Sequence, residues 1–139
     1  MFYYPVIIEQ DSETKQFMVE FVDIPCTYSV GDTYEEALLN AADALETAFM
    51  SIMQSRQTVP VASALNARPG VAVRVLIAAK VALHNAMLTS GTRKADLARK
   101  LNVAPVLVDR LLSLKHKSRI EQLEAALALL DKRLLVDIR

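Results

Sequence analysis

The residues best suited to bind a ligand are basic side chains crowded into a short C-terminal segment. From Gly91 to Arg119 the chain has eight arginine or lysine residues and two acidic residues, a net charge of +6. Guanidinium and ammonium groups at this density are typical of proteins that bind the phosphates of a nucleic acid. The segment therefore predicts a nucleic-acid contact. The alternative is a solvated face on helices that serve only dimerisation.

Residues that could catalyse a reaction do not form a consistent set. The carboxylates available for a nuclease site with two Mg²⁺ ions are Asp11, Glu20, Asp23 and Glu35. Asp11 falls in a predicted hairpin, and the other three show no convergent arrangement. His84 and His116 have no spacing relation to Cys26 or to a serine that would indicate a nucleophile. We therefore expect no enzymatic activity, no metal and no cofactor.

The two halves of the chain carry opposite charge. Residues 1–60 hold ten acidic and two basic side chains, a net charge of −8, whereas residues 61–139 hold fourteen basic and six acidic side chains, a net charge of +8. Such asymmetry indicates two modules with different partners, nucleic acid for the basic half and a basic protein for the acidic half.

The chain lacks the signals of export or membrane insertion. Its apolar runs are far shorter than the roughly 18 residues that a membrane-spanning helix needs. Residues 1–9 have neither a basic start nor a cleavage site. Cys26 is the single cysteine, so no internal disulfide can form. We expect a cytoplasmic protein with no membrane partner.

Alternating side chains predict strands near the start of the chain. Apolar residues recur at every second position in 2–8 and again in 17–21, and the polar stretch 10–16 between them can close a hairpin. A short third strand is expected near 27–30.

A helix is predicted to follow these strands. Thr33 and Glu36 have the spacing of a capping box, in which Thr33 accepts a backbone N–H and Glu36 bonds back to the Thr33 backbone. Apolar residues at helical spacing then continue to about Ser55. Val71, Val73 and Val75 indicate a returning strand. The order β-β-β-α-β predicts one helix across one face of a small mixed sheet.

The pattern in residues 94–111 predicts two helices that cross at a tight turn. Ala98 leaves room for the crossing, Asn102 suits a left-handed turn residue, and Pro105 suits the first turn of the second helix. The apolar positions expected to face inward are Leu97, Leu101, Val103, Val108 and Leu111.

This pattern resembles the Cro/C1-type helix-turn-helix family, and the resemblance extends over residues 77–130. In that family the second helix enters the major groove of DNA. The candidate DNA-binding residues are therefore Arg93, Lys94, Pro105, Val106, Asp109, Arg110, Lys115 and Lys117. By position, Lys94 corresponds to a phosphate contact. Arg110 is the one residue of the second helix that can bind guanine through two hydrogen bonds.

Several segments of the chain are similar to HicB-type antitoxins. They are Tyr4-Pro-Val, Phe21-Val-Asp-Ile-Pro25, Gly31-Asp-Thr-Tyr-Glu-Glu-Ala37, Asp43-Ala-Leu45 and Ala48-Phe49. The resemblance implies a degraded ribonuclease-H-like module joined to a C-terminal helix-turn-helix. It also implies a protein that neutralises a HicA-type toxin, a small basic ribonuclease that cleaves messenger RNA, and that represses its own operon.

The resulting expectation is an α+β protein with two modules. Residues 1–76 would form an acidic toxin-binding module, with Asp23, Ile24 and Pro25 in the contact surface or, alternatively, in a turn that ends the second strand. Residues 77–139 would form an all-α module that binds double-stranded operator DNA and assembles a homodimer or higher homo-oligomer. The alternation in 134–138 could add a terminal strand. A different reading is a helix-turn-helix regulator whose N-terminal module senses a small molecule or another protein.

Overall fold

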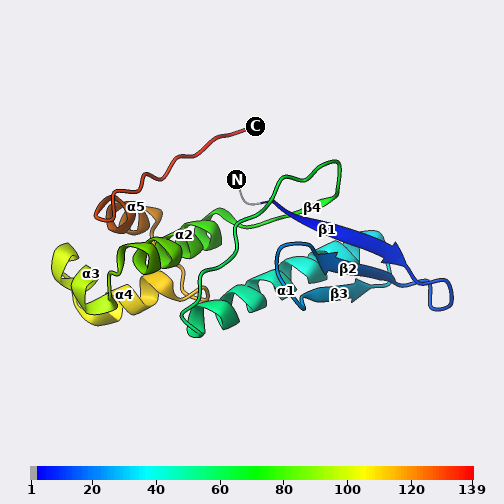
Figure 1. The fold of residues 1–139 in the computed structure, drawn as a ribbon, viewed down its shortest axis with the longest axis horizontal. Coiled ribbons are helices and arrows are strands. Elements are labelled where there is room, and N and C mark those ends of the chain that lie inside the picture. Colours follow the sequence, from blue (N-terminus) through cyan, green and yellow to red (C-terminus); the bar gives the residue numbers. More distant parts are fainter. Residues whose placement is uncertain (1–2) are drawn as a thin grey trace. The chain divides into compact units, whose positions relative to one another are not determined.

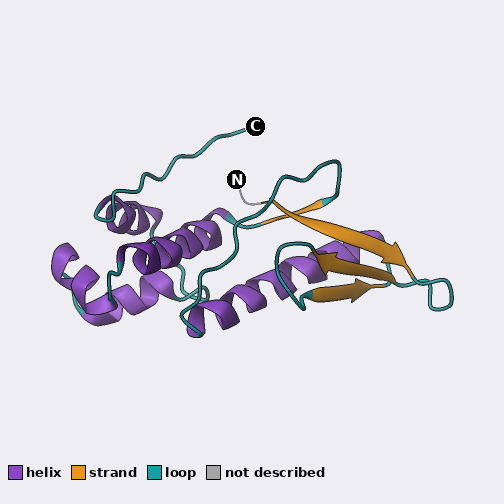
Figure 2. Ribbon diagram, viewed as in Figure 1, coloured by secondary structure: helices purple, strands orange, loops and turns teal. Residues whose placement is uncertain are grey.

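The computed structural model describes residues 3–139, which form four strands and five helices (Figures 1 and 2). They divide into two compact units. The first unit holds the chain up to Gln54 together with Val59–Arg74, and the second holds Ser55–Thr58 together with Val75–Arg139. The first unit has ten acidic and three basic residues, a net charge of −7. The second has six acidic and thirteen basic residues, a net charge of +7.

The first unit contains a sheet whose strands lie in the order β3-β2-β1-β4. The strands are β1 (Tyr3–Gln10), β2 (Phe17–Phe21), β3 (Tyr28–Gly31) and β4 (Gly70–Ala72). Every neighbouring pair is antiparallel, so the prediction of a mixed sheet was wrong. A short connection after the helix would have entered a strand parallel to β1. Residues 59–69, which belong to the first unit, instead bring the chain back to the sheet before β4 begins.

Helix α1 (Tyr34–Gln54) covers one face of the sheet, and it buries Ala37, Ala41, Leu45 and Phe49 there. Its first turn is capped almost as predicted. The Glu36 N–H donates to Thr33 Oγ1 at 3.1 Å, but the Glu36 carboxylate accepts from the Asp32 N–H, at 3.2 Å, rather than from Thr33.

The core of the first unit forms where β1 meets α1. Tyr4 is 0% exposed, its ring centroid lies 5.4 Å from that of Phe49, and its hydroxyl donates to the Pro60 carbonyl at 2.7 Å. Burial, with a smaller effect of the Asp23 charge, raises the pKa of Tyr4 to about 12. Val6, Val19, Phe21 and Ile24 are buried in the same unit.

The second unit is helical. Its elements are α2 (Val75–Ser90), α3 (Lys94–Leu101), α4 (Pro105–Leu112) and α5 (Ile120–Ala128). Helix α2 contacts α4 and α5, and α3 contacts α4 and α5 as well. His84 of α2 is buried, and its Nε2 donates to the Gln57 carbonyl at 2.7 Å. None of the described helices is long and apolar enough to cross a membrane.

Two expected strands differ from the structure. The strand predicted from Val71 to Val75 ends at Ala72, and Val75 already begins α2. The alternating residues Leu134, Val136 and Ile138 form no strand, because no described segment pairs with them. Alternation alone does not supply the partner that a strand requires for its backbone hydrogen bonds.

Tyr4 gives the first unit a testable response to alkaline pH. The folded chain keeps this hydroxyl protonated to about pH 12, whereas an unfolded tyrosine ionises near pH 10. The stability that this difference provides is therefore complete below pH 10 and is lost as pH rises through 12. In a tyrosinate absorbance titration, a final step near pH 12 should accompany unfolding of the unit. The step should be absent in Tyr4→Phe. A late step of equal size in that variant would contradict the assignment.

Candidate functional site

The face of the sheet opposite α1 is mostly accessible and apolar. Side chains alternate along each strand, so that most residues facing away from the helix remain accessible, although Pro5 of β1 on this face is buried. Those with large apolar side chains are between 40% and 59% exposed: Tyr3, Ile7, Met18, Tyr28 and Val30. We call this surface, together with Glu9 and Glu20, the open face.

The strand register places carboxylates among these apolar side chains. Glu20 of β2 lies opposite Ile7 of β1 and Tyr28 of β3. Met18 of β2 lies between Glu9 of β1 and Val30 of β3 in the same way. Opposite residues on one face of an antiparallel pair are about 5 Å apart. The open face is therefore a continuous patch in which acidic groups are set among apolar ones.

The turn after β2 contains the three residues predicted to contact a toxin. Asp23 accepts hydrogen bonds from the Ser63 N–H at 2.8 Å and from the Ser63 hydroxyl at 3.0 Å, so it ties the turn to the segment before β4. Ile24 is 1% exposed and belongs to the core. Pro25 is exposed. Of the three side chains, Asp23 and Pro25 are thus accessible to a partner, whereas Ile24 anchors the turn.

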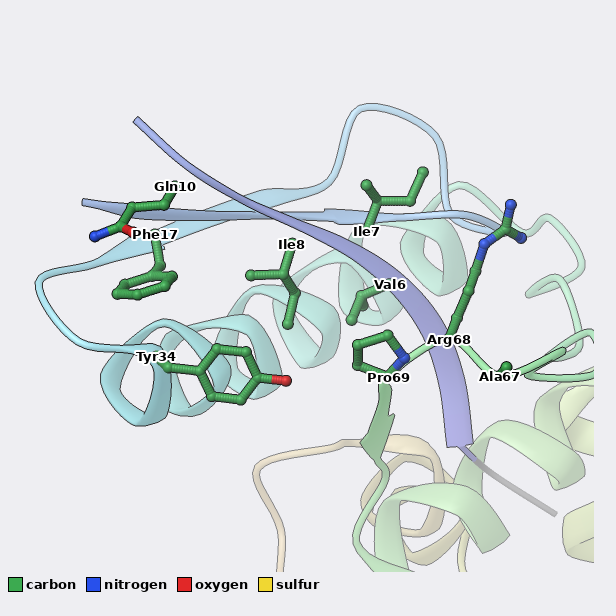
Figure 3. Close-up of a pocket in the computed structure, with 9 residues that line it drawn as sticks. All are labelled: Val6, Ile7, Ile8, Gln10, Phe17, Tyr34, Ala67, Arg68 and Pro69. Carbon is green, nitrogen blue, oxygen red and sulfur yellow. The ribbon is translucent and has the colours of Figure 1, made fainter. Parts of the chain in front are cut away.

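A shallow hollow of about 540 Å³ lies beside β1, just before β4 begins (Figure 3). Its walls include Ile8, Phe17, Tyr34 and Pro69, with Gln10 and Arg68 as the long polar side chains. The Phe17 and Tyr34 rings meet edge to face, with centroids 5.9 Å apart. Within residues 3–139 no group of three or more His, Cys, Asp or Glu side chains could hold a metal ion. The hollow provides apolar contact rather than catalytic groups.

The second unit brings α3 and α4 together through a short turn. Asn102 ends α3 in the left-handed conformation, with φ 55° and ψ 49°, and Pro105 occupies the first turn of α4, as the sequence predicted for both. Leu97 and Ala98 of α3 and Val108 of α4 are buried at this junction. The local spacing of small, apolar and turn residues therefore produces two helices in fixed contact.

All eight predicted DNA-binding residues are exposed, and six of them form no ion pair among the described residues. The other two pair with each other: Lys94 Nζ lies 2.9 Å from Asp109 Oδ1, which links the start of α3 to α4. Asp96 accepts a hydrogen bond from the Arg93 N–H at 3.1 Å and pairs with Arg99. That backbone N–H is the main cause of the lowered Asp96 pKa, with the Arg99 charge adding to it.

Sequence reasoning missed two features of these surfaces. One is the open face. Its signal was that apolar residues occupy successive positions in the first strands, which makes both faces of the sheet apolar. The other is Lys80, which is 0% exposed and donates three hydrogen bonds inside the second unit. Its only signal was a cation within the apolar run of α2.

The amino-acid sequence is similar to known proteins over most of the chain. Residues 3–82 match the family model of HicB-like antitoxins of bacterial toxin–antitoxin systems. The chain belongs to the HicB-like antitoxin family. The match covers all four strands, α1 and the first half of α2. Family membership implies a toxin as partner.

Individual HicB antitoxins are similar over nearly their whole length. Antitoxin HicB of Pseudomonas fluorescens (strain Pf0-1) is 39% identical over 133 residues, 94% of this chain and 91% of the relative. Antitoxin HicB 2 of Photorhabdus laumondii is 44% identical, with 94% and 92% covered. Antitoxin HicB of Escherichia coli (strain K12) is 36% identical, with 94% and 95% covered. These names denote antitoxins rather than enzymes, which confirms the prediction of a non-enzymatic protein.

Proposed function

We propose that this antitoxin neutralises a HicA-type ribonuclease by binding the toxin's basic surface with the open face of its sheet. The observation that carries the proposal is the set of five exposed apolar side chains interleaved with Glu9 and Glu20 on a face that no helix covers. Exposed apolar patches of this kind are typical of sites of protein association.

Charge and apolar contact contribute differently to this binding. A ribonuclease must present positive charge to the phosphates of its messenger RNA, and the first unit carries a net charge of −7. Electrostatic attraction between the toxin and the first unit increases the rate of association. The apolar side chains that become buried in the contact set the lifetime of the complex. An antitoxin bound at the toxin's phosphate-binding surface excludes the RNA. Asp23 and Pro25 would extend the contact at the end of β2.

We also propose that the second unit represses the antitoxin's own operon through a helix-turn-helix formed by α3 and α4. The turn at Asn102, the exposed Pro105 and Val106 at the start of α4 and the net charge of +7 support it. Arg93, Lys115 and Lys117 would bind phosphates, while Arg110 would read a base. A homodimer or higher oligomer would match two half-sites.

These proposals assign one role to each module of a cytoplasmic protein. Residues 1–76 would form a degraded ribonuclease-H-like module that binds the toxin, and residues 77–139 a module that binds operator DNA and carries the dimer contact. The ion pair between Lys94 and Asp109 gives the second module a particular property. Asp109 neutralises a cation that the resemblance places at a phosphate, so it weakens phosphate binding in general rather than at one sequence.

Binding to the toxin tests the first proposal. Met18→Ala and Tyr28→Ala should each weaken binding of the HicA-type protein encoded beside the antitoxin gene by about tenfold, mainly through faster dissociation. Glu20→Lys should slow association. Surface plasmon resonance with the full chain measures both rates, and rescue of cell growth provides a second measurement.

Two matched variants in the same unit serve as controls. Leu39→Ala removes an apolar side chain that is 71% exposed on α1, and Glu13→Lys makes the same charge change in the hairpin between β1 and β2. Both should retain wild-type dissociation and growth rescue. If Leu39→Ala weakens binding while Met18→Ala and Tyr28→Ala do not, the open face is not the toxin-binding surface.

Binding to the promoter upstream of the antitoxin gene tests the second proposal. Affinity should fall steeply as salt increases, because phosphate contacts release counterions. Arg110→Ala should reduce the discrimination between operator and random DNA by about 1–3 kcal/mol. Asp109→Asn should instead strengthen binding to both DNAs, because it releases Lys94. Gel shifts over a salt series measure these effects, with the exposed Lys132→Ala as a control outside α3 and α4. Equal losses on both DNAs for Arg110→Ala would make Arg110 a phosphate contact.

A further inference from the structure

A buried lysine joins α2 to the segment that follows α4. Lys80 lies within the apolar part of α2 and is 0% exposed. Its Nζ donates to the Arg110 carbonyl, the Ser113 carbonyl and the Ser118 hydroxyl, each at 2.8 Å. An ammonium group has three N–H donors, and all three are used here.

The three acceptors belong to the end of α4 and to the basic loop, which we define as residues 113–119 between α4 and α5. Carbonyl groups at a helix C-terminus lack partners within the helix and lie at its negative end, so a cation is favourable there. Ser118 makes further contacts in the loop, with its Oγ 3.0 Å from His116 Nδ1 and 3.2 Å from the Arg110 carbonyl. Lys80 thus holds both ends of the segment from Arg110 to Ser118.

The side chains on the basic loop are suited to bind phosphate. Lys115, Lys117 and Arg119 are exposed, and the loop has no acidic residue. Three like charges in seven residues repel one another, and a loose loop would lose conformational entropy on binding a phosphate backbone. Contacts that order the loop beforehand reduce this cost. Leu114, 9% exposed, and Lys80 provide such contacts from inside the unit.

Burying a lysine side chain at this position is energetically unfavourable. Burial lowers its pKa to about 8, since the charged form is disfavoured away from water. None of the ion pairs formed by the described residues includes Lys80. A well-packed apolar side chain would avoid this penalty. Such a side chain could not, however, form the hydrogen bonds that link α2 to the end of α4 and to the loop.

We propose that Lys80 is a positioning residue for DNA binding. It fixes the basic loop so that Lys115, Lys117 and Arg119 bind phosphates of the same DNA whose groove α4 enters. The inference rests on the proposed DNA-binding function, and it adds a residue that touches no DNA itself.

The test is Lys80→Met in the full chain, because methionine retains an unbranched apolar side chain without a donor. We expect affinity for the upstream promoter to fall about tenfold, and the slope of log affinity against log salt to become less steep by about one to three, since each phosphate contact contributes about 0.9. Amide hydrogen exchange in 113–119 should become faster. Lys117→Ala should weaken the wild-type protein but have no further effect in Lys80→Met.

Two other variants separate positioning from stability. Ser118→Ala removes one of the three acceptors and should reproduce part of the change in slope and exchange. Leu83→Ala makes a cavity beside the same helix and keeps Lys80 and its three acceptors, so it should lower the melting temperature and leave the salt slope and loop exchange unchanged.

The outcomes distinguish this inference from the function on which it rests. If the wild-type protein binds the promoter and Lys80→Met retains its salt slope and loop exchange, the positioning role is overturned while DNA binding stands. If Leu83→Ala changes the slope as much as Lys80→Met does, Lys80 acts only through stability and the inference fails. If the wild-type protein binds no upstream DNA even at low salt, both the inference and the proposed repression fail.

Discussion

The close approach of α1 to the sheet is the contact on which the first unit depends. A Cβ atom at Gly31 would lie 2.4 Å from the Ala37 nitrogen and 2.7 Å from its Cα, so only glycine lets the chain turn from β3 directly into the helix. Ser29 Oγ donates to the Ala37 carbonyl and Asn40 Nδ2 to the Val30 carbonyl, each at 2.8 Å. These bonds hold the helix against β3, and its buried stripe then fills the inner side of the sheet.

A single helix covers only one side of a four-stranded sheet. The outer side is therefore left to solvent or to a partner, and its large apolar residues favour a partner. The opposite charges of the two units also affect which partner each unit attracts. The negatively charged first unit attracts a basic protein and repels a polyanion. The positively charged second unit repels a basic protein and attracts a polyanion. Opposite charges on the two units thus reduce competition between two classes of ligand on one short chain.

Local features of the fold were predictable from sequence, and features that depend on distant segments were not. The start of α1 at Thr33, the left-handed Asn102 and the position of Pro105 follow from capping and turn preferences of single residues. The direction of β4 depends on the path of a long loop, which no local pattern encodes.

In the candidate sites, too, local properties of residues were predictable from sequence and long-range contacts were not. Exposure of Arg93, Arg110, Lys115 and Lys117 could be expected from their charge. The burial of Ile24, by contrast, depends on packing among segments distant in sequence. The bonds of Lys80 likewise require residues thirty or more positions away, so they appear only once α2 and α4 are packed together.

The division of the chain into units limits how recombination between related genes can exchange them. The chain passes from one unit to the other after Gln54, after Thr58 and after Arg74. A recombination event with a single crossover after Arg74 would therefore transfer α2–α5 without residues 55–58, and would replace the segment whose Gln57 carbonyl accepts from the buried His84. Related genes can exchange the helical half intact only when that four-residue segment travels with it or is already the same in both parents.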